Sequence, residues 1–100
     1  MTHLHIQTFR LLPGMEDQFL SGSQAFDTEM IPKLKAFGLL AREVLRSDDG
    51  QWTIMTRWES AEALHKAMQG ESTPPAFMAA IDPVSRSKSQ HDVVSSTQEG

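Results

Sequence analysis

The 100-residue sequence contains no cysteine. Thiol catalysis, disulfides and cysteine-based zinc or iron–sulfur sites are therefore excluded. The sequence also lacks any run of the roughly 18–20 apolar residues that a membrane span needs. Its first residues, MTHLHIQ, lack the apolar core of a signal peptide. We therefore expect no membrane contact and a cytoplasmic location.

Positive charge is scarce as well. Thirteen acidic and nine basic residues give a net charge of −4, whereas nucleic-acid binding depends on clustered lysine and arginine. The basic segment RSK, Arg86 to Lys88, is too short to reverse that balance. The sequence also has no glycine-rich phosphate loop. We therefore expect no nucleic-acid partner and no cofactor.

The composition is that of one globular domain. Apolar residues make up 39% of the chain and charged residues 22%, and the length allows a real core but no separate cofactor domain. We expect residues 1–95 to form a single domain and residues 96–100 to form a disordered tail.

Alternation of apolar and polar side chains predicts four strands. They span Thr2–Leu12, Leu39–Ser47, Gln51–Trp58 and, with a weaker period, Val84–Val94. The turn sequence DDG, Asp48 to Gly50, predicts that the second and third strands form a hairpin.

Helical spacing and end signals predict the remaining elements. The first helix is indicated by an apolar stripe at Met15, Phe19, Phe26 and Met30. Pro32 should interrupt this helix, and its buried side should continue through Phe37 to Gly38. Ser60 is a good N-cap for a second helix that ends at Gly70. A short extra helix is expected in STPPAFMAAIDP.

The resulting order, βαββα(α)β, favours a ferredoxin-like α+β fold. In that fold a four-stranded antiparallel sheet carries its helices on one face. Apolar side chains nevertheless occur on both faces, with Trp52, Ile54 and Trp58 on one and Leu4 and Ile6 on the other. An uncovered face of this kind is more apolar than a monomer usually tolerates. We therefore expect a homodimer that forms through the sheet face.

Three segments carry a resemblance to a known family. They are RLLPGMEDQFL, MIPKLKAFGLLAREVLRS and, above all, TIMTRWESAEALHKAM. They resemble the antibiotic biosynthesis monooxygenase superfamily of small dimeric α/β barrels, over about Leu4–Ile81. The resemblance implies a dimer with a pocket between sheet and helices in each subunit. The family includes cofactor-independent monooxygenases of aromatic compounds, haem-degrading enzymes and enzymes of small signalling molecules, and fold alone does not choose among them.

The resemblance also implies pocket residues. In family enzymes, a tryptophan matching Trp58 and a polar residue matching Gln7 line the pocket. Haem-degrading members carry a histidine ligand after the second helix, where this chain reads ESTPPAFMAAI without a histidine. Haem degradation is therefore the disfavoured alternative.

An oxygenase of this composition would take most of its chemistry from the substrate. The pocket would deprotonate an electron-rich phenol or quinol and hold the anion while it reacts with oxygen. We expect His65, or a bound water, to act as the base and Gln7 to donate a hydrogen bond to the oxyanion. His5, Phe19 and Phe77 complete the expected ligand-binding set. The sequence leaves open a non-catalytic homodimer that binds a small apolar ligand.

Two histidines in the first strand raise the question of a metal. His3 and His5 share a face at a spacing that can chelate one. An antiparallel last strand would bring His91 or Asp92 alongside them. Terminal strands often carry solvated histidine and aspartate, so we expect no metal site.

Overall fold

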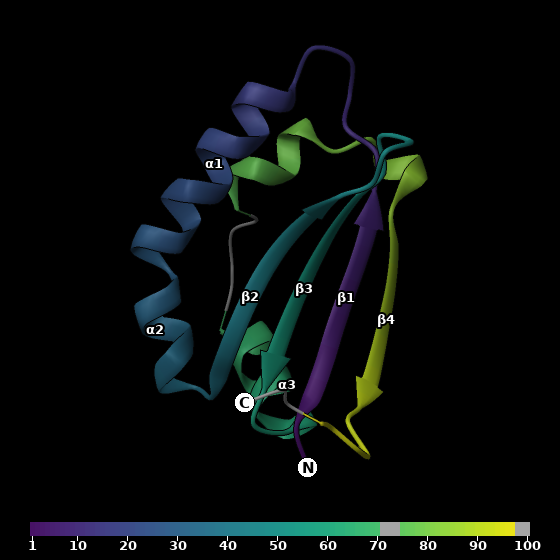
Figure 1. Ribbon diagram of the computed structural model, residues 1–100. Coiled ribbons are helices and arrows are strands. Elements are labelled where there is room, and N and C mark those ends of the chain that lie inside the picture. The colour runs from purple at the N-terminus through teal and green to yellow at the C-terminus, as the bar shows by residue number, and fades with distance from the viewer. Residues whose placement is uncertain (71–74, 98–100) are drawn as a thin grey trace.

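The computed structural model of the protein describes residues 1–70 and 75–97. The elements are β1 (His3–Phe9), α1 (Glu16–Glu29), α2 (Ile31–Ala36), β2 (Leu39–Arg46), β3 (Trp52–Trp58), α3 (Ala61–Gln69), the 3₁₀ helices η1 (Ala76–Ala80) and η2 (Pro83–Ser85), and β4 (Ser87–Asp92) (Figure 1). The strands form one antiparallel sheet in the order β2-β3-β1-β4. The predicted ferredoxin-like α+β fold is confirmed. The predicted start of the short helix at residues 72–74, and residues 98–100 of the predicted tail, lie outside the described residues.

Several local signals act where the sequence predicts them. Pro32 lies in the first turn of α2, where its missing N–H costs nothing, and it separates α2 from α1. Gly50, with a φ of 87°, takes the left-handed conformation that the hairpin turn between β2 and β3 requires. The Ser60 hydroxyl accepts a hydrogen bond of 3.1 Å from the backbone N–H of Ala63 and caps α3.

One expectation for α2 is wrong. Phe37 was expected on the buried side, but it is 51% exposed. It caps the C-terminal end of α2 beyond the last helical residue, and Leu34 is the residue of α2 that enters the core.

The helices cover one face of the sheet, and α1 and α2 follow one another along that face (Figure 1). Against that face the core divides into two clusters. One contains Phe9, Phe19, Trp52, Ile54 and Phe77, and the other contains Leu34, Leu39, Trp58, Leu64 and Ala67. Phe26 packs against both. Among the described residues, no helix has the length and apolar character needed to cross a bilayer.

Strand register decides which side chains face the helices. Because the sheet is antiparallel throughout, residues paired across neighbouring strands lie on the same face. Two rows therefore cross the middle of the helix-facing side: Arg42–Thr56–His5–Gln90 and Val44–Ile54–Gln7–Lys88. These rows lie between Trp58 and His3 at one end of the sheet and Trp52 and Phe9 at the other.

Gly22 allows α1 to approach η1 closely. A Cβ atom at Gly22 would lie 3.1 Å from the Cα and Cβ atoms of Phe77. The absence of a side chain therefore lets Phe77 reach the aromatic cluster, where its ring centroid lies 5.9 Å from that of Phe19 and 5.4 Å from that of Phe26.

The buried ring of His3 ties β1 to the edge strand β4. Its Nδ1 lies 2.8 Å from Oδ1 of Asp92, and its Nε2 lies 2.9 Å from Oε1 of Gln90. Two oxygen acceptors suit the protonated ring, which has two N–H donors. The hydrogen bonds to Gln90 and Asp92 raise the pKa of His3 above its usual 6.5. His91 pairs with Leu4 and so lies on the opposite face, which means that His3, His5 and His91 do not cluster.

The raised pKa of His3 predicts a pH-dependent contribution to stability. The stabilisation is complete below about pH 6.5, the unfolded value, and is lost as the pH rises through the folded pKa. We expect Asp92→Asn, which keeps an oxygen acceptor but removes the charge, to lower the free energy of unfolding more at about pH 5.5 than at about pH 8.5. Urea unfolding at both pH values measures the difference. Asp49→Asn, in the exposed pair with Arg10, is the matched control, and an equal loss for Asp92→Asn at both pH values would contradict the assignment.

Candidate functional site

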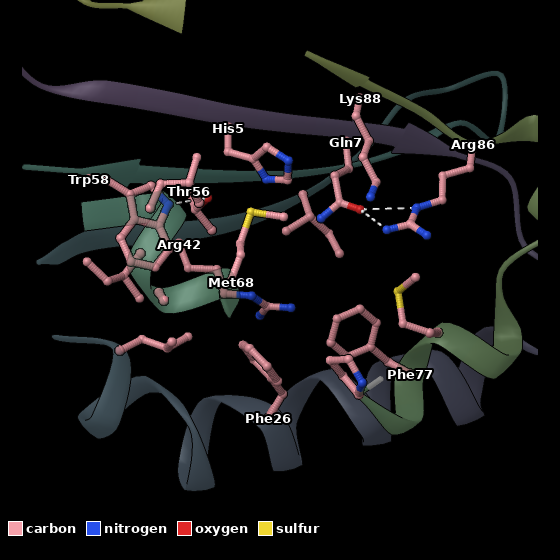
Figure 2. A pocket seen from close by; sticks show the side chains of 17 residues that line it. His5, Gln7, Phe26, Arg42, Thr56, Trp58, Met68, Phe77, Arg86 and Lys88 are labelled. Atoms are coloured by element: carbon pink, nitrogen blue, oxygen red, sulfur yellow. Dashed lines mark hydrogen bonds between the residues drawn. The ribbon is translucent and has the colours of Figure 1, made fainter. Parts of the chain in front are cut away.

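A cavity of about 410 Å³ lies between the helix-facing side of the sheet and the helices. Its volume falls within the range of about 300–1,000 Å³ typical of small-molecule sites. His5, Gln7 and Trp58 line it from the sheet, and Phe26, Met68 and Phe77 line it from the helical side (Figure 2). The cavity occupies the space between the two core clusters, where polar and charged side chains cross the sheet.

Trp58 forms one wall of this cavity. The side chain is buried, with 4% exposure, among Leu34, Leu64 and their neighbours. Its indole N–H donates a hydrogen bond of 2.9 Å to Oγ1 of Thr56, the neighbouring residue on the same face. The indole is therefore fixed in place and presents an apolar surface to the cavity.

Gln7 is held in one orientation by Arg86. Oε1 of Gln7 accepts hydrogen bonds from Nε of Arg86 at 3.3 Å and from Nη2 of Arg86 at 2.9 Å. Because the guanidinium can only donate, it fixes the amide oxygen toward itself. The amide nitrogen of Gln7 points away from Arg86 into the cavity (Figure 2), where it offers a donor to a ligand.

His5 is the lining group that can exchange a proton near neutral pH. It lies two residues from Gln7 on the same strand face, and it is buried. Burial lowers the pKa of His5 below its usual 6.5, and the nearby charges of Lys88 and Arg86 lower it further. His5 is therefore neutral at pH 7 and has a ring nitrogen available as an acceptor.

The charged residues of the cavity wall are all cationic. Arg42, Arg86 and Lys88 line the cavity, and none of the lining residues that the structure describes is an aspartate or glutamate. This contrasts with the net charge of −4 for the whole chain. The cavity therefore favours a negatively charged or proton-donating ligand.

These three cations were missed by sequence reasoning. The RSK segment containing Arg86 and Lys88 is too short to reverse the acidic charge balance of the chain. The pairing of β4 with β1 nevertheless sets Lys88 beside Gln7. For Arg42 the available signal was its position in β2. It lies on the same face of the strand as Val44, whereas Glu43 between them lies on the opposite face. Either inference needed the register of strands far apart in the sequence.

The structure separates the predicted site residues into two groups. Gln7, Trp58, His5 and Phe77 line the cavity. Phe19 does not, because it is fully enclosed in the aromatic cluster between the rings of Phe9 and Trp52.

His65 also lies outside the cavity lining. The helix α3 turns Leu64 and Ala67 into the core, and this phase leaves the His65 side chain exposed. The geometry therefore gives no support to His65 as the base, and His5 is the histidine that faces the site.

No metal site accompanies this geometry within residues 1–70 and 75–97. No group of three histidine, aspartate or glutamate side chains there is arranged to hold a metal ion. What the cavity offers is a neutral imidazole, an oriented amide donor and three cations against aromatic walls. Such an arrangement can accept a proton and stabilise the anion that results.

No protein-family model and no curated protein matches the sequence. Solved structures do match it along nearly its whole length. A protein of Bacillus cereus proposed to be an antibiotic biosynthesis monooxygenase aligns with a TM-score of 0.73 and 20% identity, covering 99% of this chain and 97% of that one. A variant of SnoaB, a cofactor-independent oxygenase from Streptomyces nogalater, aligns with a TM-score of 0.68 and 14% identity, covering 98% of each chain.

A third match is a dimeric ferredoxin-like protein from an uncultured marine organism. It has a TM-score of 0.72 and 13% identity, covering 99% of this chain and 93% of that one. At such low identity these likenesses concern the fold. The chain shares its ferredoxin-like α+β fold with these three proteins, and this is the fold that its sequence resemblance predicts.

Proposed function

We propose that the protein is a cofactor-independent monooxygenase of small aromatic compounds of the phenol or quinol type. The observation that carries this proposal is the environment of His5. Burial keeps this imidazole neutral, and every other ionisable side chain among the described lining residues is a cation. The structural likeness to SnoaB, a cofactor-independent oxygenase, adds support for the reaction class.

In the first step, His5 accepts the proton of the substrate hydroxyl. A histidine with a lowered pKa is a weak base, so the reaction needs help from groups that favour the anion. Gln7 and Lys88, which are paired across β1 and β4 and both line the cavity, supply that help through an amide N–H and an ammonium. Both act on the oxyanion as it forms, and Arg86 already holds Gln7 in position before the substrate arrives.

In the second step, the electron-rich anion reacts with molecular oxygen. Electron transfer and radical recombination form a carbon–oxygen bond at a hydrogen-bearing ring carbon ortho or para to the hydroxyl, and the proton held by His5 returns to the peroxide anion to give a hydroperoxide. Loss of the hydrogen on that carbon together with hydroxide releases water and leaves a quinone carbonyl. One oxygen atom enters the product and the other leaves as water, so no external reductant is required. Trp58, Phe26 and Phe77 supply the apolar walls that exclude water from this step.

Oxygen consumption tests this proposal. The wild-type protein is expected to raise oxygen uptake by fused-ring phenols above the uncatalysed rate, and ¹⁸O₂ should place one labelled atom in the quinone. His5→Gln should lower kcat/KM by about 100-fold or more, the usual range for loss of a general base. The matched comparison is His65→Gln, which should leave kcat/KM unchanged. A loss with His65→Gln and none with His5→Gln would overturn the assignment.

The lowered pKa of His5 also fixes the direction of the pH profile. Because the neutral ring is the active form, kcat/KM should be level near pH 7 and fall on acidification, with a midpoint below 6.5. This acid limb should be absent from the residual activity of His5→Gln.

A non-catalytic ligand-binding protein is the second candidate. It is favoured by the weak basicity of His5 and by the lack of any carboxylate among the described lining residues. Saturable binding of phenols without oxygen uptake would select it. Haem degradation gains nothing from the geometry, because the η1 segment carries no histidine.

We also propose that the protein is a homodimer through the sheet face that carries no helix. Ile6 and Met55 pair directly on that face, with Leu4 beside them and the exposed side chain of Leu45 on β2. Apolar side chains at the centre of a sheet face are best buried by a second copy of the same face, which gives a closed two-fold interface.

Light scattering after size-exclusion chromatography tests the dimer. The wild-type protein should elute at twice the chain mass of 11.2 kDa. Ile6→Glu, which would bury unpaired carboxylates across the two-fold axis, should elute as a folded monomer. Val84→Glu, on the exposed η2 segment, should remain dimeric. A monomeric wild type, or a folded and dimeric Ile6→Glu protein, would contradict this interface.

A further inference from the structure

Arg42 is the most deeply buried cation of the cavity wall. Its side chain is only 5% exposed. Nη1 donates to Oδ1 of Asp27 at 2.8 Å and to Oγ of Ser23 at 3.1 Å. The guanidinium carbon lies 4.9 Å from the ring centroid of Phe26 and 5.5 Å from that of Phe77. The guanidinium is therefore fixed by two hydrogen bonds and by contact with two aromatic rings, that of Phe26 on α1 and that of Phe77 on η1.

The other terminal nitrogen of Arg42 has no such partner. Nη2 is buried and makes no hydrogen bond to any residue that the structure describes. A buried donor without an acceptor is destabilising, and an arginine that served only to hold α1 against β2 would be expected to satisfy both nitrogens. Since Arg42 belongs to the cavity wall, an acceptor on a bound ligand would satisfy this nitrogen.

The charge around Arg42 defines the chemistry of that acceptor. Asp27 faces Nη1 and offsets part of the charge, but its own side chain is half exposed and does not line the cavity. Arg86 and Lys88 add positive charge from the β4 side. A carboxylate matches this field, and its planar oxygens suit a guanidinium that is already held in position.

The positions of the polar groups set the length of the ligand. His5 and Gln7 lie on the sheet, while the Arg42 guanidinium extends from β2 toward the aromatic rings of the helical side (Figure 2). A ring system between these groups would contact Trp58, Phe26 and Phe77. We propose that the substrate is a hydroxylated aromatic acid, with its hydroxyl at His5 and Gln7 and its carboxylate bound by Arg42. This assignment rests on the proposed function and names the substrate class of the same cavity.

Binding requires one local movement. Nη2 of Arg42 is enclosed, so a carboxylate reaches it only when a neighbouring side chain moves. Met68 extends into the cavity from α3 (Figure 2). It is flexible and half exposed, so it is the side chain expected to yield.

The test is a calorimetric titration with two matched compounds, 6-hydroxy-2-naphthoate and its neutral analogue 6-hydroxy-2-naphthamide. The wild-type protein should bind the acid about 10- to 100-fold more tightly than the amide, the range for a charge-assisted hydrogen bond. Arg42→Met should bring the ratio of the two dissociation constants close to one. Arg46→Met is the matched control, because Arg46 lies on the same face of β2 but pairs with Glu16 outside the cavity, and it should keep the wild-type ratio.

A second variant keeps the test valid if Arg42→Met fails to fold. Asp27→Asn preserves the side-chain shape but removes the charge that offsets Arg42. It should tighten binding of the acid by about two- to fivefold and leave the amide unchanged, because an ion pair whose carboxylate is half exposed contributes about that much. A purely structural role for the pair would not produce this difference between the ligands.

Three other outcomes overturn the inference in distinct ways. Equal binding of acid and amide by the wild-type protein would leave the proposed function standing and remove the carboxylate. Loss of the ratio with Lys88→Gln, but not with Arg42→Met, would place the anion on β4 instead. No binding of either compound would overturn the proposed function together with the inference.

Discussion

The structure depends on how the helix-facing side of the sheet is filled. Phe9 and Trp52 lie at one end of this side, in one apolar cluster, and Trp58 lies at the other end, in a second cluster. Between them the register sets Arg42, Thr56 and His5 in one row across three strands. Polar side chains in that row cannot be packed into an apolar core without partners. The helices therefore bridge the two clusters, and the space over the polar row remains as the cavity.

The same constraint gives the cavity its electrostatic character. In a chain with a net charge of −4, three of the nine lysine and arginine residues line this cavity, and the acidic partner of Arg42 lies on α1 outside the cavity wall. Burial amplifies the charge of Arg42, whose side chain is only 5% exposed, because little water screens it. The result is a lowered pKa for His5 and a preference for anions, produced by residues on β1, β2 and β4 and by Arg86 just before β4. The proposed chemistry on an acidic aromatic compound depends on this field more than on any single catalytic residue.

The fold was largely predictable because its signals are local. Alternation identified the strands, Pro32 and Ser60 marked helix starts, and the faces of β1 and β3 followed from their period of two. The site was less predictable because it depends on long-range packing. The contributions of Arg42 and Lys88 required the pairing of β2 with β3 and of β4 with β1. The phase of α3 exposes His65, which lies at the margin of the apolar stripe of alanine, leucine and methionine, where spacing alone leaves the direction of a side chain open. Phe19 is an aromatic residue of the kind that lines pockets, but it lies inside the aromatic cluster. Only the packing of the folded chain distinguishes these two positions.

The most direct test of the central claim, that the helix-facing cavity binds aromatic compounds, is a ¹H–¹⁵N spectrum of the indole groups. The chain has two tryptophans: Trp58 lines the cavity and Trp52 does not. A Trp52→Phe protein assigns the two indole signals. Titration with a fused-ring phenol should move the Trp58 signal saturably while the Trp52 signal stays nearly fixed. No movement of the Trp58 signal, or equal and unsaturable movement of both, would contradict the account.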